Sequence, residues 1–350
     1  MATDVIKIGP DFAQGDVIAR AAGILSAGGL VAFPTETVYG VGARADLPQA
    51  MERLRELKGR SAAKAFTVHI GSREGAVDYA PKMSGLTRRL MRKAWPGPLT
   101  LILPVSEEDS PPILEGRDES AREAMYYNGR VGLRCPDDAV AAALLLAVPH
   151  PVVAASANLA GNQPPQTGDD VLRELDGRID LLIDSGRTRY NKASTIVQVN
   201  GQNFELVREG VYDARIVERL ASLRILFVCS GNTCRSPMAA ALAERVLAER
   251  LGCHPSDLTA RGIVISSAGT SGGYGGAADH AVTVMARRGL DLSEHASTPL
   301  TLERLHQSDY TFAMTRAHRD AIVRMDPTAA DRVRLLLDDR GSGWACHTHP

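Results

Sequence analysis

The chain of 350 residues has few cysteines, few aromatic residues and almost no net charge. Its five cysteines (Cys135, Cys229, Cys234, Cys253 and Cys346) follow no spacing typical of a disulfide framework, which suits a reducing compartment. The formal net charge is −1, so no overall basic field attracts nucleic acid or acidic membranes. These absences argue against a disulfide-stabilised secreted protein and against a strongly basic nucleic-acid-binding protein.

The sequence also lacks long hydrophobic runs. No apolar run reaches membrane-spanning length, and the first residues, Met1–Lys7, lack the apolar core of a signal peptide. We therefore expect a cytoplasmic protein. A hydrophobic content of 44% and a charged content of 23% are typical of globular proteins, and the length exceeds that of one typical domain.

We predict two domains, residues 1–208 and 223–350, joined by a linker at 209–222 that contains a short helix at 211–220. In the first domain, short apolar or β-branched runs predict strands, and segments between them have helical periodicity. The predicted strands are 30–34, 66–70, 99–104, 131–134, 152–155 and 194–199, and the predicted helices are 17–27, 48–57, 86–93 and 138–146. This alternation indicates an α/β domain with a twisted mixed sheet.

A cysteine motif opens the second domain. The short run Ile225–Val228 predicts a central parallel strand, and residues 238–250 have helical spacing, so the segment from Cys229 to Arg235 connects a strand to a helix N-terminus. Free backbone N–H groups and the helix dipole favour an oxyanion there, and they also favour Cys229 as a thiolate nucleophile. The fork of Arg235 suits two phosphoryl oxygens, and Ser236 can donate to the thiolate.

We therefore predict a phosphate-binding loop, in which Gly231 lets the backbone close around the anion. The loop residues between the cysteine and the arginine are Ser230, Gly231, Asn232, Thr233 and Cys234. The alternative is a buried cysteine followed by an ordinary helix.

This segment resembles the low-molecular-weight protein tyrosine phosphatase family, and the likeness continues through residues 266–270 and 289–295 to cover about 222–338. The resemblance implies a doubly wound parallel sheet, Cys229 as the acceptor of the phosphoryl group, Arg235 as the stabiliser of its oxygens, and a phosphoprotein substrate. Thr233 occupies a position where tyrosine-specific members have a bulkier aliphatic residue. Since the protein-arginine phosphatase branch is similar here, a preference for phosphoarginine is a hypothesis.

The general acid of that family is not evident. In the family it belongs to an Asp-Pro loop after a Leu-Leu-Asp stretch, whereas here Asp338 and Asp339 lead into a different tail. Asp326-Pro327 comes too early and is typical of a helix-ending turn. Asp338 or Asp339 could substitute, but we predict an impaired phosphatase, with a phosphoprotein-binding scaffold as the alternative. The tail also carries possible metal ligands, although we expect no metal site there: Cys346, His347 and His349.

Polar groups follow several predicted strands of the first domain. Thr35 and Tyr39 come after the strand at 30–34, and Ser156 and Asn158 come after the strand at 152–155. At the end of the helix at 48–57, three cations surround a glycine: Lys58, Arg60 and Lys64. Such a cluster suits a polyphosphate, although alone it is more often a solvated helix end.

Six ordered motifs in residues 15–210 resemble the threonylcarbamoyl-AMP synthase (YrdC-like) family. They are Pro34–Gly40, Lys58-x-Arg60 with Lys64, Trp95–Thr100, Val131–Pro136, Ser156–Asn158 and Ser194–Val197. Enzymes of this family combine L-threonine, bicarbonate and ATP into threonylcarbamoyl-AMP and release pyrophosphate. A tRNA-modifying transferase consumes the product to modify the adenosine beside the anticodon.

The resemblance implies roles for individual residues. The triphosphate would be held by Lys58, Arg60 and Lys64, with Mg²⁺ bound largely by phosphate oxygens and water. Threonine would be surrounded by Thr35, Tyr39, His69 and Arg134, with Arg134 or Arg60 as a clamp for its carboxylate. Nucleotide or phosphate would bind Ser156, Asn158 and Ser194, and Arg208 would close over the site.

Some interpretations stay open. Ser61 and Ala65 replace prolines usual in the family, and residues 107–128 form an insertion or an altered loop. His69 is as well suited to packing as to ligand contact, and for Glu36 an exposed loop carboxylate is favoured over a general base. The alternative function is a non-catalytic module that binds RNA or nucleotide.

Overall fold

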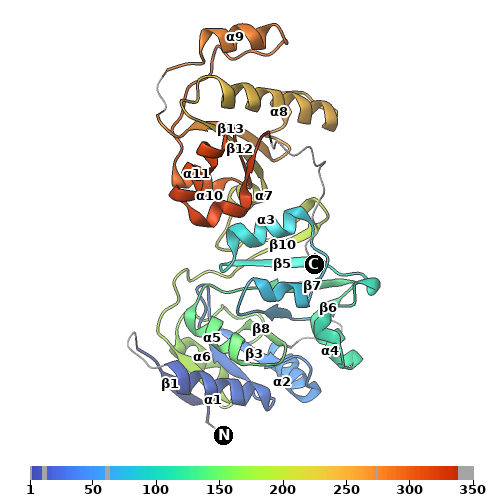
Figure 1. Cartoon of the computed structure of the whole chain (residues 1–350). Helices are drawn as coiled ribbons and strands as arrows, with labels where there is room; N and C mark the ends of the chain where they lie inside the picture. The colour runs from blue at the N-terminus through green and yellow to red at the C-terminus, as the bar shows by residue number, and fades with distance from the viewer. Residues whose placement is uncertain (1, 10–13, 60–63, 273–274, 338–350) are drawn as a thin grey trace. The chain divides into compact units, whose positions relative to one another are not determined.

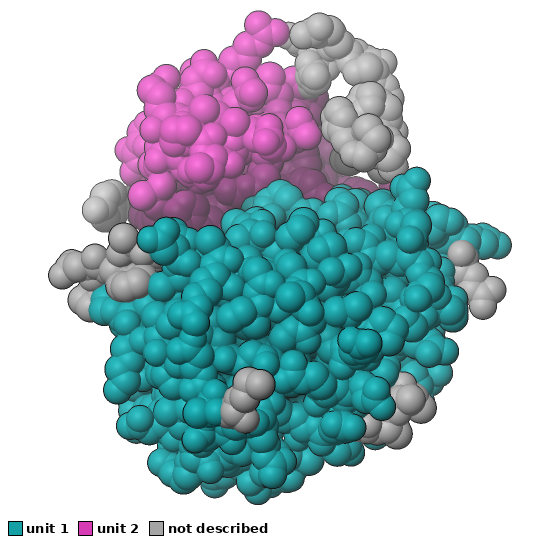
Figure 2. Space-filling view, turned by 90° about the horizontal axis from the view of Figure 1, so that it is seen from below, with its two compact units in different colours: residues 1–220 teal, residues 221–350 magenta. Residues whose placement is uncertain are grey.

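The computed structural model describes residues 2–9, 14–59, 64–272 and 275–337. The chain divides into two compact units, residues 1–220 and 221–350 (Figure 2). The division falls within the segment 209–222, where helix α7 (Ala214–Ala221) forms. Each unit has its own sheet and its own core, and each is described by itself.

Unit 1, residues 1–220, contains an 11-stranded sheet among its described residues, in the order β1-β9-β2-β3-β8-β4-β7-β5-β10-β11 with β6 paired to β7 (Figure 1). Parallel pairs such as β4–β7 and β5–β10 stand beside antiparallel pairs such as β3–β8 and β5–β7. The predicted mixed sheet is therefore confirmed. Its strands are β1 (Asp4–Lys7), β2 (Val31–Phe33), β3 (Gly40–Arg44), β4 (Thr67–His69), β5 (Leu99–Pro104), β6 (Tyr126–Tyr127), β7 (Arg130–Arg134), β8 (Val152–Ser156), β9 (Leu181–Asp184), β10 (Thr195–Asn200) and β11 (Asn203–Arg208).

The helices of unit 1 begin and end where local sequence favours it. Helix α2 begins with Pro48 at its first position and ends at Gly59, whose positive φ of 53° closes the last turn. Asp138 caps α5 by accepting hydrogen bonds from the backbone N–H groups of Val140 and Ala141. The helices before the linker are α1 (Gln14–Ser26), α2 (Pro48–Lys58), α3 (Gly85–Ala94), α4 (Glu119–Met125), α5 (Ala139–Ala147) and α6 (Gly168–Leu175).

A continuous apolar core holds α1 and α5 against the sheet. It includes Leu25, Phe33, Leu144, Val152 and Leu181, from both helices and from β2, β8 and β9. This core also explains why strand β3 contains glycines, which give the sequence little sign of a strand there. Its two glycines weaken the strand pattern, but a Cβ on Gly42 would lie 3.0 Å from the Phe33 ring, so a small residue is needed there.

Unit 2, residues 221–350, contains a four-stranded sheet in the order β13-β12-β14-β15, and every pairing is parallel. Helix α8 covers one face of the sheet, with α9 packed against α8, and α10 and α11 cover the other face (Figure 1), as predicted for a doubly wound domain. Helix α11 ends at Met325 before Asp326-Pro327, which confirms the predicted helix-ending turn. The elements are β12 (Leu223–Cys229), α8 (Arg235–Leu251), β13 (Ile263–Gly269), α9 (Asp279–Ala286), α10 (Leu302–Gln307), β14 (Tyr310–Ala313), α11 (Arg316–Met325) and β15 (Val333–Leu335).

Because the two units have separate cores, we expect core substitutions to act on one unit at a time. Leu144→Ala in unit 1 and Leu226→Ala in unit 2 each remove a fully packed side chain and should cost about 2–5 kcal/mol of unfolding free energy. Calorimetric unfolding of the full chain should show each substitution lowering a different transition. A single transition shifted equally by both would contradict this expectation.

Candidate active sites

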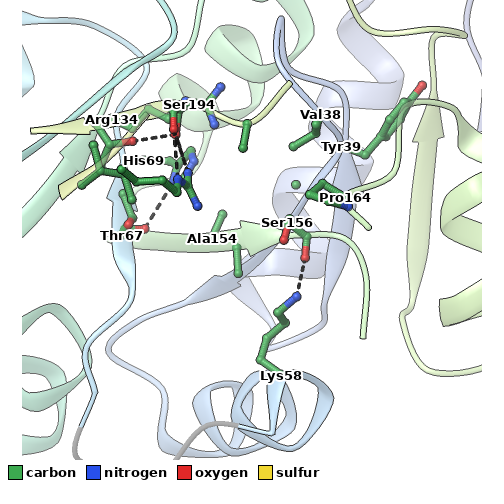
Figure 3. Close-up of a pocket in the computed structure, with 16 residues that line it drawn as sticks. Val38, Tyr39, Lys58, Thr67, His69, Arg134, Ala154, Ser156, Pro164 and Ser194 are labelled. Atoms are coloured by element: carbon green, nitrogen blue, oxygen red, sulfur yellow. Dashed lines mark hydrogen bonds between the residues drawn. The ribbon is translucent and has the colours of Figure 1, made fainter. Parts of the chain in front are cut away.

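A cavity of about 150 Å³ lies in unit 1, where the ends of several strands meet (Figure 3). It brings together many of the predicted site residues, although they come from distant parts of the sequence. Those that line it are Tyr39, Lys58, His69, Arg134, Ser156, Ser194 and Arg208. Among the described residues, none that lines the cavity has a carboxylate, so the charged groups of this lining are cations or groups that can become cationic.

The floor of the cavity is one row of residues across five neighbouring strands. His69 is paired with Arg134, Arg134 with Thr100, Thr100 with Ile196, and Ile196 with Arg208. Directly paired residues share a face of the sheet, so this row aims two guanidinium groups and one imidazole into the same space. Strand register thus decides which side chains meet.

Arg134 is buried, with 6% of its surface exposed, and it pairs with the buried carboxylate of Glu36 at 3.2 Å. Its Nη2 atom also donates to the hydroxyls of Thr35 and Thr37. The Nε atom is buried and has no hydrogen-bond partner among the described residues. Since a buried donor without a partner is costly, this N–H is a candidate ligand contact.

The burial of Glu36 corrects our expectation of an exposed loop carboxylate. Its side chain has 0% exposure and also accepts a hydrogen bond from the backbone N–H of Asp137 at 3.1 Å. The carboxylate compensates the charge of Arg134, because an isolated buried guanidinium would be strongly destabilising. Its partners leave it no evident role as a base.

His69 is a neutral imidazole in this site. Burial, followed by the nearby charge of Arg134, lowers the pKa of His69 to about 3. Its Nδ1 atom lies 3.1 Å from the carbonyl oxygen of Thr67, so Nδ1 carries the hydrogen and Nε2 is left as an acceptor. His69 therefore offers the cavity an acceptor among donors.

Lys58 reaches the cavity from the last turn of α2. Its ammonium donates to the carbonyl oxygen of Ser156 at 2.9 Å (Figure 3) and to the Asn158 side-chain oxygen at 3.2 Å. Of the other two predicted cations, Lys64 is exposed and does not line the cavity, and Arg60 lies outside the described residues, as does Ser61. The predicted cluster of three cations is thus represented in the cavity by Lys58.

Ser194 and Arg208 close one side of the cavity. Arg208 donates to the carbonyl oxygen of Ser194 at 2.8 Å, and the hydroxyls of Ser194 and Thr100 lie 3.0 Å apart. Burial, followed by the charge of Arg134, lowers the pKa of Arg208. Two guanidinium groups that repel each other across a cavity would both be stabilised by a bound anion.

Three predicted residues have other partners. The Tyr39 hydroxyl donates to the Gly186 carbonyl oxygen at 2.7 Å, and Tyr39 points away from Arg134 in Figure 3. Burial raises the pKa of Tyr39 to about 12, so it stays a neutral phenol. Thr35 is buried beside Arg134, and the Asn158 amide donates within its own loop, to Leu159 and Asn162. Neither Thr35 nor Asn158 lines the cavity.

In unit 2, β12 ends at Cys229 and α8 begins at Arg235, with the predicted phosphate-binding loop between them. The Cys229 sulfur lies 3.0 Å from the Ser236 hydroxyl and accepts from the backbone N–H of Asn232 at 3.3 Å. The loop therefore places donors around the sulfur, as a thiolate nucleophile requires.

Asn232 fixes the shape of this loop. It is fully buried with a positive φ of 57°, and its amide donates to Ser236 at 2.9 Å and to Ser267 at 2.8 Å. Its backbone carbonyl oxygen accepts from Ser297 at 2.9 Å and lies 2.7 Å from a ring nitrogen of His295. Sequence motifs indicated the loop but did not assign these supporting roles to Ser267, His295 or Ser297, which are separated from it in sequence.

The two aspartates predicted as possible general acids belong to the C-terminal tail. Asp338 and Asp339 lie outside the described residues, and so do Cys346, His347 and His349. Within the described part of the chain, no cluster of three or more histidine, cysteine, aspartate or glutamate side chains is arranged to hold a metal. Among the same residues, no helix combines the length and the apolar character needed to cross a bilayer.

Fold and site together define a protein with a cationic α/β cavity in one unit and a cysteine phosphate-binding loop in the other. The family model Sua5/YciO/YrdC, described as "Telomere recombination", matches residues 23–210, and the chain belongs to this family. The model of the low molecular weight phosphotyrosine protein phosphatases matches residues 224–343, so a domain of that type is fused to it. Both resemblances inferred from motifs are confirmed.

Curated relatives carry the name threonylcarbamoyl-AMP synthase. That of Pyrococcus abyssi is 34% identical over 62% of this chain, and that of Bacillus subtilis is 37% identical over 55%. The matches span 62% and 53% of the length of these two relatives.

Solved structures share the fold. P. abyssi Sua5 complexed with L-threonine aligns with a TM-score of 0.55 and 23% identity, over 76% of this chain and 92% of its own. Escherichia coli YciO aligns with a TM-score of 0.53 and 25% identity, over 61% of this chain and 99% of its own.

The buried His69 should make the stability of unit 1 depend on pH. In the unfolded chain His69 binds a proton near pH 6.5, but in the folded protein its pKa is about 3. The unfolded state therefore binds more protons between these values, and unfolding free energy should fall with falling pH by up to about 1.4 kcal/mol per unit from this group. Chemical denaturation between pH 7 and 4 should show a smaller change of unfolding free energy per pH unit for His69→Gln than for the unsubstituted chain. An equal slope would contradict the prediction.

Proposed function

We propose that unit 1 is an L-threonylcarbamoyladenylate synthase, which combines L-threonine, bicarbonate and ATP into threonylcarbamoyl-AMP with release of pyrophosphate and water. The supporting relatives carry this activity in their names. The observation that carries the proposal is the cavity itself, where Lys58, Arg134 and Arg208 converge without a carboxylate in the lining. All three substrates carry negative groups that such a cavity attracts.

The threonine carboxylate is the ligand group best matched to Arg134. The buried Nε–H of Arg134 needs an acceptor, and a carboxylate oxygen would supply one with charge assistance. The Nε2 acceptor of His69 lies in the same cavity and suits the hydroxyl or the amino group of threonine. A bound threonine would thus satisfy an acceptor as well as a donor. The solved P. abyssi Sua5 is a complex with L-threonine, which supports this proposal.

Lys58 and Arg208 would act on ATP. The threonine amine and bicarbonate would first condense to a carbamate, forming an N–C bond with loss of water. When an oxygen of this carbamate attacks the α-phosphorus of ATP, an O–P bond forms and the bond to pyrophosphate breaks, so negative charge grows on the leaving group. Fixed cations stabilise such charge mainly by electrostatics. Mg²⁺ would arrive with ATP, held by phosphate oxygens and water, because the cavity lining offers no carboxylate ligand.

Pyrophosphate release by the purified full chain tests this function. We expect release only when ATP, L-threonine and bicarbonate are all present. Arg134→Lys keeps the charge but loses the planar guanidinium fork. It should raise the KM for threonine by about 10- to 100-fold, which corresponds to a loss of ~1.4–3 kcal/mol of binding free energy. Arg130→Lys is the matched control, since Arg130 on the same strand bonds Val199 and Asn200 outside the cavity.

Two outcomes would count against the synthase. One is release of pyrophosphate without dependence on threonine. The other is stabilisation of the chain against heat by RNA but not by ATP with threonine, which would favour the non-catalytic RNA-binding alternative. If the synthase is correct, its product would pass to a tRNA-modifying transferase, and we propose a cytoplasmic location for that exchange.

For unit 2 we propose slow phosphatase chemistry through Cys229. The sulfur would attack the phosphoryl group of a phosphoprotein, forming an S–P bond as the bond to the leaving group breaks, and water would then release phosphate. Ser236 and the Asn232 N–H stabilise the sulfur as the leaving thiolate in the second step. Without an Asp-Pro loop, the leaving group would lack a proton donor that is typically worth 10²- to 10⁴-fold in rate.

Phosphate release from phosphotyrosine and phosphoarginine peptides tests this proposal. We expect slow release that is abolished in Cys229→Ser and unchanged in Cys253→Ser, whose cysteine lies outside the loop. Faster turnover of phosphoarginine, reduced in Thr233→Ile, would support the preference predicted from Thr233. Equal release by wild type and Cys229→Ser would contradict phosphatase chemistry and favour a phosphoprotein-binding scaffold.

A further inference from the structure

A buried histidine in unit 2 has no role in the chemistry proposed above. His318 lies in the first turn of α11, 6% exposed, and its Nε2 atom lies 2.8 Å from the hydroxyl of Ser230. Ser230 directly follows Cys229 and is the first residue of the phosphate-binding loop after the cysteine. His318 and Ser230 are 88 residues apart in sequence, so folding creates this contact.

The hydrogen bonds around Ser230 are all satisfied by a neutral imidazole whose Nε2 atom accepts from the Ser230 hydroxyl. Arg235 can only donate, so the Ser230 oxygen accepts from its Nη2 atom at 3.2 Å. In this tautomer the Ser230 hydroxyl, whose own hydrogen remains to be donated, donates to Nε2 of His318. Nδ1 consequently carries the hydrogen and donates to the Thr315 hydroxyl at 2.9 Å. A chain of hydrogen bonds therefore runs from Thr315 through His318 and Ser230 to the guanidinium group of Arg235.

The surroundings favour the neutral imidazole that this chain requires. Burial, followed by the positive charge of Arg235, lowers the pKa of His318 below its ordinary value. A protonated His318 would present a donor to Ser230 and a second positive charge to Arg235. The site therefore favours the neutral imidazole, the form in which Nε2 can accept a hydrogen bond.

We propose that His318 is a positioning residue for the phosphate-binding arginine. By accepting from Ser230, it orients the Ser230 oxygen toward Arg235 and so holds the guanidinium against the loop before phosphate arrives. Arg235 is otherwise exposed, and ordering a long exposed side chain costs conformational entropy at the moment of binding. The proposal rests on the phosphate-binding role of the Cys229 loop.

Binding of inorganic phosphate to the full chain, measured by calorimetry, tests the proposal without relying on turnover. Ser230→Ala and His318→Leu should each weaken phosphate binding by about tenfold. The double variant should bind phosphate no more weakly than either single variant, because both substitutions break the same chain of hydrogen bonds. His318→Gln, whose side-chain oxygen can accept in place of Nε2, should restore binding to within about threefold of wild type. His254→Leu is the control, since His254 bonds Ser256 away from the loop.

The outcomes distinguish a failure of the positioning role of His318 from a failure of the phosphate-binding role of the loop. If Arg235→Ala does not weaken phosphate binding, the loop assignment fails. If Arg235→Ala weakens binding but Ser230→Ala does not, the positioning role is wrong although the loop stands. His318→Gln as weak as His318→Leu, or losses that multiply in the double variant, would show that His318 only packs and would overturn the proposal. Ser230→Ala keeps the test decisive should His318→Leu fail to fold.

Discussion

The buried ion pair between Glu36 and Arg134 is the contact on which the geometry of unit 1 depends. Arg134 could not occupy the cavity floor without a compensating charge, because leaving one partner of a buried pair alone typically costs about 3–5 kcal/mol. Glu36 supplies that charge and accepts from the backbone of Asp137, while its own backbone carbonyl accepts from Tyr190. Glu36 thus joins its own segment to residues 134–137 through its carboxylate and to Tyr190 through its backbone. The cavity that we propose to bind anions is therefore built around a buried carboxylate of its own.

In unit 2 a buried neutral side chain, that of Asn232, fixes the geometry of the site. The amide of Asn232 and its backbone carbonyl oxygen hold the loop to Ser236, Ser267 and Ser297, so the Asn232 N–H is already directed at the Cys229 sulfur. The positive φ of Asn232 costs strain that these bonds offset. In both units polar side chains buried below the site fix the groups that face the ligand, which reduces reorganisation when an anion binds.

Much of this could be predicted from the sequence, and the failures have a common physical cause. Strands such as 99–104 and helices such as 48–57 were predictable because their periodicity is local. The phosphate loop was equally local, since Cys229 and Arg235 lie within a few residues of each other. Both domain resemblances rested on such short motifs, and they hold.

What sequence could not reveal are partners chosen by the tertiary fold. Glu36 has the sequence context of an exposed loop carboxylate, yet its partner Arg134 lies 98 residues away. The row from His69 to Arg208 depends on strand register, which no local pattern encodes. For the same reason nothing near His318 in sequence indicates that it contacts Ser230. Strand β3 was missed because packing against Phe33 outweighs the low strand propensity of its glycines.

The central claim is that the Nε–H of Arg134, which has no hydrogen-bond partner among the described residues, is a ligand-binding group in a cavity built for anions. A crystal structure of the full chain with L-threonine, ATP and Mg²⁺ tests it most directly. The account predicts a carboxylate or phosphate oxygen within hydrogen-bond distance of Arg134 Nε, with the Glu36 pair intact. Ligands bound elsewhere in unit 1, with that atom still lacking an acceptor, would contradict it.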